Sequence, residues 1–210
     1  MIALAVALII LIVLCTAAAM HARSAAYQIG NTEKIASKLD GELYLVHNKH
    51  DGKQEAADKL AEMNARIVTL LRSMKTKYKN DTSMRGAITR QLLAHYNPDN
   101  IVENSPYDPE GDTAYTIDKG ALIALCLRDG PDLKMIDDNT QFFVVLHELA
   151  HVGIKDLDHT LLFWRTFKFL LGEAHAAGLI VVVDYVSHPS NYCGIAVEYN
   201  PYLDPNLAPF

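Results

Sequence analysis

Cysteine is scarce in this sequence, with three residues in a chain of 210. Cys15, Cys126 and Cys193 lie far apart and form no CxxC pair. This spacing argues against a cysteine-rich zinc knuckle and gives no sign of a disulfide framework. We therefore expect reduced thiols that are buried in the protein.

Positive charge is also limited, since 19 Lys and Arg residues stand against 25 Asp and Glu residues and the formal net charge is −6. A protein that binds nucleic acid through the phosphates needs clustered Lys and Arg side chains. The sequence has no strongly basic stripe, which argues against a nucleic-acid partner. The charge pattern favours no particular oligomeric state.

Long hydrophobic runs are absent except near the first residue. Residues 2–20 carry no charge, and about 19 residues at 1.5 Å each come close to spanning a hydrocarbon core of roughly 30 Å. We therefore predict a membrane anchor at residues 1–22, with a cleaved signal peptide as the alternative because Ala17, Ala18 and Ala19 offer a cleavage site. Basic residues follow the run and none precedes it, which predicts a cytosolic domain behind a single-pass anchor.

Composition divides the remainder into three parts. Residues 23–40 are expected to form a polar linker, and residues 41–198 a globular domain. The tail, residues 199–210, contains three prolines and is expected to be irregular.

Hydrophobic periodicity predicts the elements of the first half of the domain. A strand is expected at residues 42–46, and a helix with one buried stripe at residues 54–78. A shorter helix is expected at residues 87–95. The acidic stretch at residues 97–112 is rich in Pro, Asn and Gly, so it is predicted to be a solvated loop.

The second half of the domain is expected to bring two strands and two helices together. Short apolar runs predict the strands at residues 115–117 and 121–127. A helix is expected from its cap at Asn139 to Gly153, and another from Asp158 or Thr160 to Gly178.

The first of these helices carries the motif HELAH. His147 and His151 are four residues apart, so both imidazoles project from one face of the helix and can bind one metal ion. Glu148 is rotated by about 100° from His147. There its carboxylate can act as a general base on a water molecule without binding the metal. The spacing predicts a zinc centre with Glu148 as the catalytic residue.

A catalytic zinc ion keeps three protein ligands and one open position, so a third ligand must come from elsewhere. Gly153 would let the helix end, and His159 at the start of the next helix is the expected third ligand of one zinc ion per chain. Glu173 is the alternative, and His175 a weaker one. Donors to a negatively charged oxygen in the reaction could come from Tyr185, Tyr192 or His175.

The segment HELAHVGIKDLDHTLLFWRTFKFLL, with His159 followed by Phe163 and Trp164, resembles the core of the WLM and SprT-like zincin metallopeptidases. The resemblance is closest to predicted metallopeptidases of large DNA viruses and covers residues 111–194. It implies that the three histidines bind zinc, that Glu148 is catalytic, and that the strand before the helix lines the substrate cleft. His159 stands eight residues beyond His151, two more than in yeast-type members.

Together these features predict an α+β fold: a zincin-like domain with a small sheet, an active-site helix and an N-terminal transmembrane helix. The expected function is that of a membrane-anchored zinc metallopeptidase. An inactive zincin-fold protein with a structural or interaction role at a membrane or in a virion is the alternative. A zinc hydrolase that acts on other bonds is a second alternative.

Overall fold

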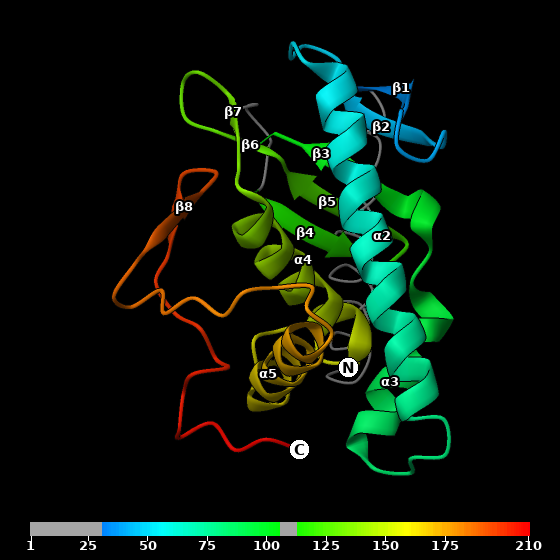
Figure 1. Ribbon diagram of the computed structural model, residues 1–210, viewed down its shortest axis with the longest axis vertical. Helices are drawn as coiled ribbons and strands as arrows, with labels where there is room; N and C mark the ends of the chain where they lie inside the picture. Colours follow the sequence, from blue (N-terminus) through cyan, green and yellow to red (C-terminus); the bar gives the residue numbers. More distant parts are fainter. Residues whose placement is uncertain (1–30, 106–112) are drawn as a thin grey trace, which may run out of the picture.

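The computed structural model describes residues 31–105 and 113–210 (Figure 1). In this part of the chain, four α-helices accompany a five-stranded sheet. The helices are α2 (Lys53–Lys77), α3 (Met84–His95), α4 (Asp138–Gly153) and α5 (Leu161–Ala176). The strands of the sheet are β1 (Thr32–Ala36), β2 (Leu43–His47), β3 (Ile101–Asn104), β4 (Ala114–Ile117) and β5 (Leu122–Cys126).

Smaller elements lie around this sheet. A 3₁₀ helix, η1 (Pro98–Asn100), precedes β3. Strands β6 (Arg128–Asp129) and β7 (Lys134–Met135) form one hairpin, and β8 (Ser190–Tyr192) and β9 (Ile195–Val197) form another.

The sheet is mixed, with the strand order β1-β2-β3-β5-β4. Its central pairs, β2 with β3 and β3 with β5, are parallel, while β1 and β4 pair antiparallel with their neighbours. Parallel neighbours need a crossover connection, and α2 and α3 supply it between β2 and β3. Strand β4 therefore lies at the edge of the sheet, where it contacts α4.

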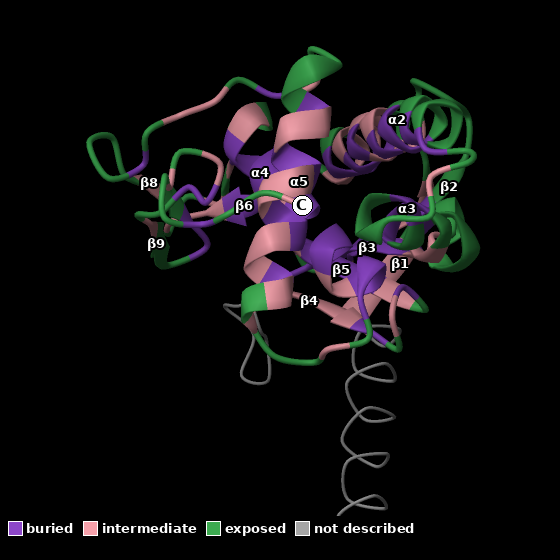
Figure 2. Cartoon of the chain, turned by 90° about the horizontal axis from the view of Figure 1, so that it is seen from below, coloured by how far each residue is buried: buried purple, intermediate pink, exposed green. Residues whose placement is uncertain are grey.

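Helices α2 and α4 lie on the same face of the sheet (Figures 1 and 2). The predicted helix 54–78 agrees with α2 to within one residue at each end, and its apolar stripe packs on β1, β2 and β3. Figure 2 shows the buried residues concentrated along β3 and β5 and on the helices that cover them. Helix α4 is enclosed between α3, α5 and β4, so its HELAH motif is fixed by packing on several sides.

The predicted fold class is wrong. The described residues form a mixed α/β domain with a parallel sheet centre, rather than an α+β domain joined to a membrane helix. None of the helices in residues 31–105 and 113–210 is both long enough and apolar enough to cross a membrane. The predicted single-pass anchor, on which the expected membrane localisation with a cytosolic domain depended, is therefore not seen in the described residues. Residues 1–22, to which the anchor was assigned, lie outside the described residues.

Two strands of the five-stranded sheet occur where the sequence predicted none. Strand β1 lies within the predicted linker and pairs with β2. Strand β3 lies within the predicted solvated loop, yet all four of its residues are buried. The reason is Glu103, whose charge suggests exposure but whose carboxylate pairs with Arg128 in the interior.

The prediction of reduced thiols is also wrong. Cys126, at the end of β5, and Cys193, in the turn between β8 and β9, form a disulfide with Cα atoms 6.4 Å apart. The two residues are 67 positions apart, so their pairing depends on the tertiary fold. Cys193 and Gly194 both have positive φ, as a two-residue hairpin turn requires.

The tail is irregular but packs against α5. Lys168 donates hydrogen bonds to the carbonyls of Asp204 at 2.6 Å and Leu207 at 2.9 Å. Arg165 donates to the carbonyl of Pro209 at 2.9 Å, and its guanidinium lies over the ring of Phe210. These contacts join the tail to the domain rather than leaving it as a free extension.

Candidate metal centre and active site

Helix α4 holds the HELAH motif in a fixed position. It begins one residue before the predicted cap, because the Asp137 carboxylate accepts from the backbone amides of Asn139 at 3.1 Å and Thr140 at 2.9 Å. At its other end, Gly153 allows close approach to α3. A Cβ atom at this glycine would lie only 3.1 Å from Ile88 Cγ2. Capping and close packing therefore fix both ends of the motif helix.

The loop that carries His159 is held at both ends. At its start, Lys119 Nζ donates to the carbonyl of His151 at 3.2 Å and to that of Asp156. At its end, Thr160 caps α5 by accepting from the Phe163 amide at 3.3 Å, and its hydroxyl donates to the Asp156 carboxylate at 2.6 Å. These bonds fix the turn that brings His159 back towards α4.

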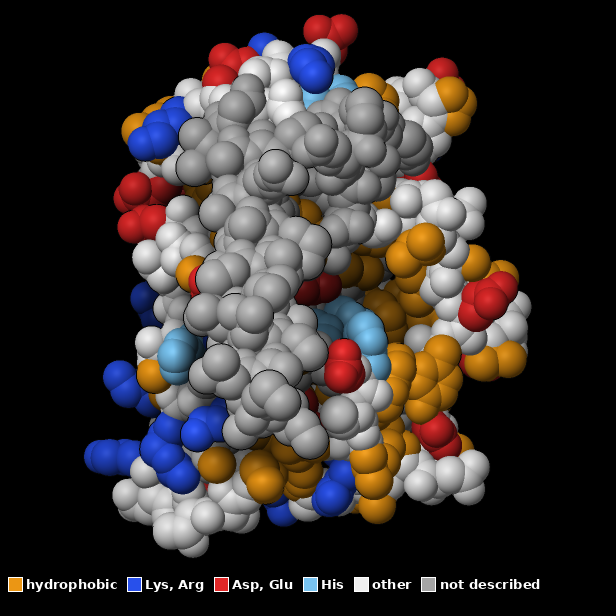
Figure 3. Space-filling model, turned by 180° about the vertical axis from the view of Figure 1, so that it is seen from behind, with side chains coloured by type: hydrophobic (Ala, Val, Ile, Leu, Met, Phe, Trp, Pro, Cys, Tyr) orange, Lys and Arg blue, Asp and Glu red, His pale blue; other side chains and the backbone are white. Residues whose placement is uncertain are grey.

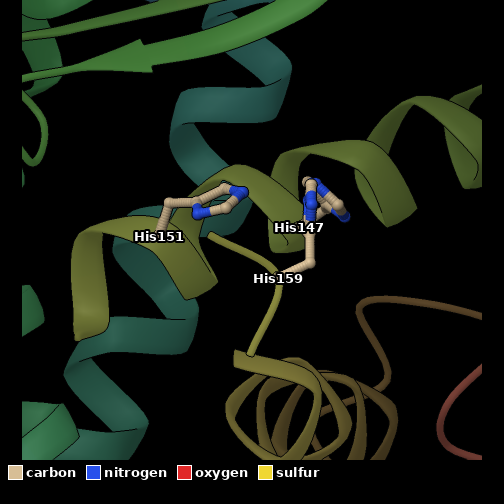
Figure 4. Close-up of side chains that lie close together, drawn as sticks. All are labelled: His147, His151 and His159. Atoms are coloured by element: carbon tan, nitrogen blue, oxygen red, sulfur yellow. The ribbon is translucent and has the colours of Figure 1, made fainter. Parts of the chain in front are cut away.

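The three histidines come together as a cluster (Figure 4). His147 and His151 extend from α4, and His159 extends from the segment that leads into α5. One ligand nitrogen from each lies within 4.8 Å of the other two. The Nε2 atoms of His147 and His159 are 3.0 Å apart. Among the described residues this is the one cluster of His, Cys, Asp or Glu side chains suited to a metal ion.

The aromatic side chain of Phe163 packs against all three histidines of the cluster. The buried ring of Phe163 lies 4.8 Å from His147, 4.3 Å from His151 and 4.6 Å from His159, measured between ring centroids. Burial lowers the pKa of His147 to about 3 and that of His151 to about 4, with neighbouring histidines adding to both shifts. Both imidazoles are therefore neutral at neutral pH, which is the form that binds a metal ion.

Glu148 is buried beside the cluster, with 4% of its surface exposed. Burial raises the pKa of its carboxyl to about 7, and a hydrogen bond from Thr116 opposes that shift. Thr116 Oγ1 donates to Glu148 Oε2 at 3.0 Å. A carboxyl group with a pKa near neutrality can both accept and return a proton, as a general acid–base catalyst must.

A cavity of about 420 Å³ opens over these groups. His147, Glu148, His151 and His159 line it on one side, and residues 114–119 around β4 line it on the other. Figure 3 shows histidine side chains in a hollow that borders a group of hydrophobic side chains. The candidate site is therefore open to a ligand that approaches along the edge strand.

The remaining predicted site residues lie in different places. Glu173, the alternative third ligand, accepts hydrogen bonds from Lys77 at 2.8 and 2.9 Å and from Tyr78 at 2.7 Å, outside the histidine cluster. The ring of His175 lies near Tyr202, at a centroid distance of 5.9 Å.

The predicted oxyanion donors are also separated from each other. Tyr185 packs edge-on against Phe143, with ring centroids 4.8 Å apart. Tyr192 is buried and shares an apolar pocket with His147 and Glu148. Of the predicted donors, Tyr192 is therefore the one placed beside the HELAH motif.

Sequence reasoning missed the residues that hold the site together. Thr116 and Lys119 lie 32 residues before their partners Glu148 and His151. Asp156, which links Lys119 to Thr160, was not singled out either. A hydroxyl on a strand and a lysine in a turn carry no local signal, because their partners are set by the packing of β4 against α4.

Comparison with known proteins finds similarity to proteins of large DNA viruses. The chain is 33% identical to the "Uncharacterized protein R325" of Acanthamoeba polyphaga mimivirus over 164 residues, which cover 78% of this chain and 81% of that protein. It is 42% identical over 72 residues to protein 136R of Invertebrate iridescent virus 6 and 45% identical over 69 residues to protein 042R of Invertebrate iridescent virus 3.

These matches differ in how much of each relative they cover. The two iridescent virus matches cover 33% of this chain and 40% and 43% of the respective proteins, so the chain spans less than half of their length. Neither a family model nor a solved structure matches the chain.

Proposed function

This chain belongs to the family of the uncharacterized mimivirus protein R325, and we propose that it is a zinc-dependent peptidase. The proposal depends chiefly on one observation. Three histidines converge beside a buried glutamate in a cavity that borders a sheet edge. A mononuclear zinc hydrolase needs two histidine ligands on one helix, a third ligand from another segment and a general base.

The size of the cluster fits zinc. Zinc-bound imidazole nitrogens lie about 2.0–2.1 Å from the metal, so two of them are at most about 4 Å apart. The three ligand atoms here lie within 4.8 Å of one another, so small rotations of the imidazoles would bring all three to bonding distance from one ion. His147, His151 and His159 would hold the ion at the wall of the cavity that Glu148 also lines. An all-nitrogen set without carboxylate or thiolate suits zinc better than calcium or magnesium.

Bound zinc would supply Lewis acidity, which polarises a carbonyl group and makes a water molecule more acidic. Glu148 accepts a proton from the attacking water while the water oxygen bonds to the carbonyl carbon of the substrate. When the C–N bond breaks, Glu148 returns that proton to the leaving nitrogen. Thr116 holds one carboxylate oxygen of Glu148, so the base keeps a single orientation through both transfers.

A peptide substrate is favoured by strand β4. Among the described strands, β4 pairs with β5 alone, and its residues line the same cavity as Glu148. An extended peptide can add to such an edge through backbone hydrogen bonds. This arrangement would align a backbone carbonyl with the histidine cluster, which supports peptide hydrolysis over hydrolysis of small esters.

The test is metal content and turnover in matched variants of the full chain. Elemental analysis should give one zinc per chain for the wild type, with weaker binding in His159→Ala and no change in Glu173→Ala. Glu148→Gln should keep its zinc and lose hydrolysis of a peptide library, and His151→Ala should lose both. Well-folded protein without zinc would refute the proposal. Zinc without any hydrolysis would instead favour an inactive zincin-fold protein.

A further inference from the structure

A second cavity, of about 260 Å³, shares part of its lining with the candidate active site. We call it the apolar pocket, and its hydrophobic walls come from α4, α5 and the β8–β9 hairpin. The residues that define it here are Ala114, Val144, Trp164, Phe167, Ile195 and Val197. This volume is below the roughly 300–1,000 Å³ typical of pockets for drug-sized ligands. It suits one side chain.

The apolar pocket is continuous with the candidate active site. Ala114, His147 and Glu148 line both cavities. A group in the apolar pocket is therefore adjacent to the base and to one of the metal-binding histidines. A peptide bound for hydrolysis at Glu148 would place a neighbouring side chain at the pocket entrance.

The direction of β4 determines which side chain this is. The strand starts at Ala114, beside the apolar pocket, and ends at Ile117, just before Asp118 and Lys119 at the far end of the cleft. An added strand pairs slightly more stably when it is antiparallel. A peptide in that direction runs from Lys119 towards Ala114, so its C-terminal part reaches the apolar pocket.

We propose that the apolar pocket binds a large aliphatic or aromatic side chain on the residue that follows the cleaved bond. This inference rests on the proposed peptidase function, which it deepens by naming the substrate class. Aromatic rings of Trp164 and Phe167 supply most of the contact surface on the α5 side, and burial of such surface favours large apolar groups. Glu198 also borders the pocket and disfavours acidic side chains.

The chain contains a reporter for this binding. Trp164 is its one tryptophan and lines the apolar pocket. Cleavage would make the residue after the broken bond the first residue of the released product. Short peptides that begin with that residue are therefore direct probes of the pocket, and their binding requires no turnover.

The experiment is a titration of Trp164 fluorescence in the full-length Glu148→Gln protein. The probes are Leu-Ala-Ala-amide, Ala-Ala-Ala-amide and Asp-Ala-Ala-amide. We expect the leucine peptide to bind about tenfold or more tightly than the alanine peptide, because a buried Leu side chain contributes much more apolar area. The aspartate peptide should bind weakest. Equal binding of all three peptides would overturn the proposal.

Variants with a charge in the pocket wall test whether the leucine preference arises in the apolar pocket. Ile195→Asp and Val197→Asp each put a carboxylate in the pocket wall, and both should reduce the leucine preference at least severalfold. Ile195 is 53% exposed, so its variant tests the pocket even if Val197→Asp fails to fold. Val186→Asp is the matched control, since Val186 is 74% exposed and lines neither cavity. An equal loss in the control would overturn the assignment.

Cleavage-site mapping with zinc-loaded wild-type protein separates this inference from the proposed function. Enrichment of Leu, Phe or Met after the cleaved bond would support both. Cleavage without such enrichment would overturn the pocket assignment and leave the peptidase intact. Leucine-selective fluorescence without any cleavage would support selective binding by the pocket and count against peptidase chemistry.

Discussion

Two buried glutamates in this domain have nearly the same exposure and very different surroundings. Glu103 on β3 is 1% exposed and Glu148 on α4 is 4% exposed. Glu103 accepts from Arg128 Nε at 2.8 Å and from the His47 amide at 2.8 Å. Glu148 accepts from the Thr116 hydroxyl at 3.0 Å and faces the cavity. Burial raises the pKa of both, but only Glu103 has a cation in direct contact to oppose the shift.

This difference separates a carboxylate that holds the fold from one that is available for chemistry. The Arg128 guanidinium also donates to the carbonyls of Asp51 and Gly52, so it ties β3 to the start of α2. Among the described residues, no Lys or Arg pairs with Glu148, whose carboxylate accepts from Thr116 and lines the cavity. Substitutions at the two positions should therefore have opposite effects on stability and on turnover.

The largest expected effect is on turnover in Glu148→Gln. Loss of the general base should lower the rate of peptide hydrolysis by roughly 10²–10⁴-fold. The free energy of unfolding should stay close to the wild-type value, because the amide removes a buried ionisable group and can still accept the Thr116 hydrogen bond. Steady-state kinetics and urea unfolding measure the two quantities.

Glu103→Gln provides the contrast, with a clear loss of stability and near-normal turnover of the folded protein. A Glu148→Gln variant that unfolds as easily as Glu103→Gln would mean that both carboxylates are structural.

The next effect is on stability in Arg128→Met. Removing one partner of a buried ion pair leaves the other charge uncompensated and typically costs about 3–5 kcal/mol. Urea denaturation should show a loss of this size, while zinc content per folded molecule is unchanged. The double variant Glu103→Leu/Arg128→Met should recover much of the loss. Failure of the double variant to recover would show that the hydrogen bonds of Arg128 to Asp51 and Gly52 matter more than the ion pair.

A smaller loss is expected when the disulfide between Cys126 and Cys193 is removed. The bond joins two residues that are 67 positions apart. Cys126 lies two residues before Arg128, so the bond belongs to the part of the domain that Glu103 and Arg128 stabilise. The variant Cys126→Ser/Cys193→Ser should lose about 2–4 kcal/mol of unfolding free energy. Thermal unfolding with and without a thiol reductant measures it. The reductant should destabilise the wild type and leave the double variant unchanged; equal responses would contradict the bond's role.

The sequence predicts elements and motifs that depend on local patterns. The stripe of α2, the short helix α3 and the end of the motif helix follow from periodicity and a glycine, whereas the cap predicted at Asn139 is at Asp137. The spacing of His147 and His151 follows from helix geometry. His159 needed a further assumption, that the chain turns back within eight residues, and the structure brings it to the other two histidines.

The rest depends on pairings between distant residues. Strand β3 was missed because Glu103 looks exposed until Arg128, 25 residues later, is placed beside it. The disulfide was missed for the same reason. Thr116 and Lys119 carry no motif, and their roles follow only from the contact of the β4 segment with α4. The membrane anchor was predicted from the apolar composition of residues 1–22, and these residues lie outside the described part of the chain.

The smallest effect is expected in Lys119→Met, on the catalytic side of the comparison. Lys119 joins the end of α4 to Asp156, at the start of the loop that carries His159. Groups that orient metal ligands typically contribute 10- to 100-fold in metal affinity. Because Lys119 holds backbone carbonyls rather than an imidazole, we expect about a tenfold weaker zinc affinity, measured by competition with a chelator.

Lys155→Met is the matched control, because Lys155 is an exposed lysine in the same loop. The zinc affinity of this control should equal that of the wild type. Both variants should keep the wild-type unfolding free energy to within about 1 kcal/mol, since single partly exposed charge interactions contribute little to stability. Equal zinc affinity in the two variants would mean that Thr160 and the packing of Phe163 place His159 without Lys119. A large stability loss in Lys119→Met would instead move this lysine to the structural side, beside Arg128.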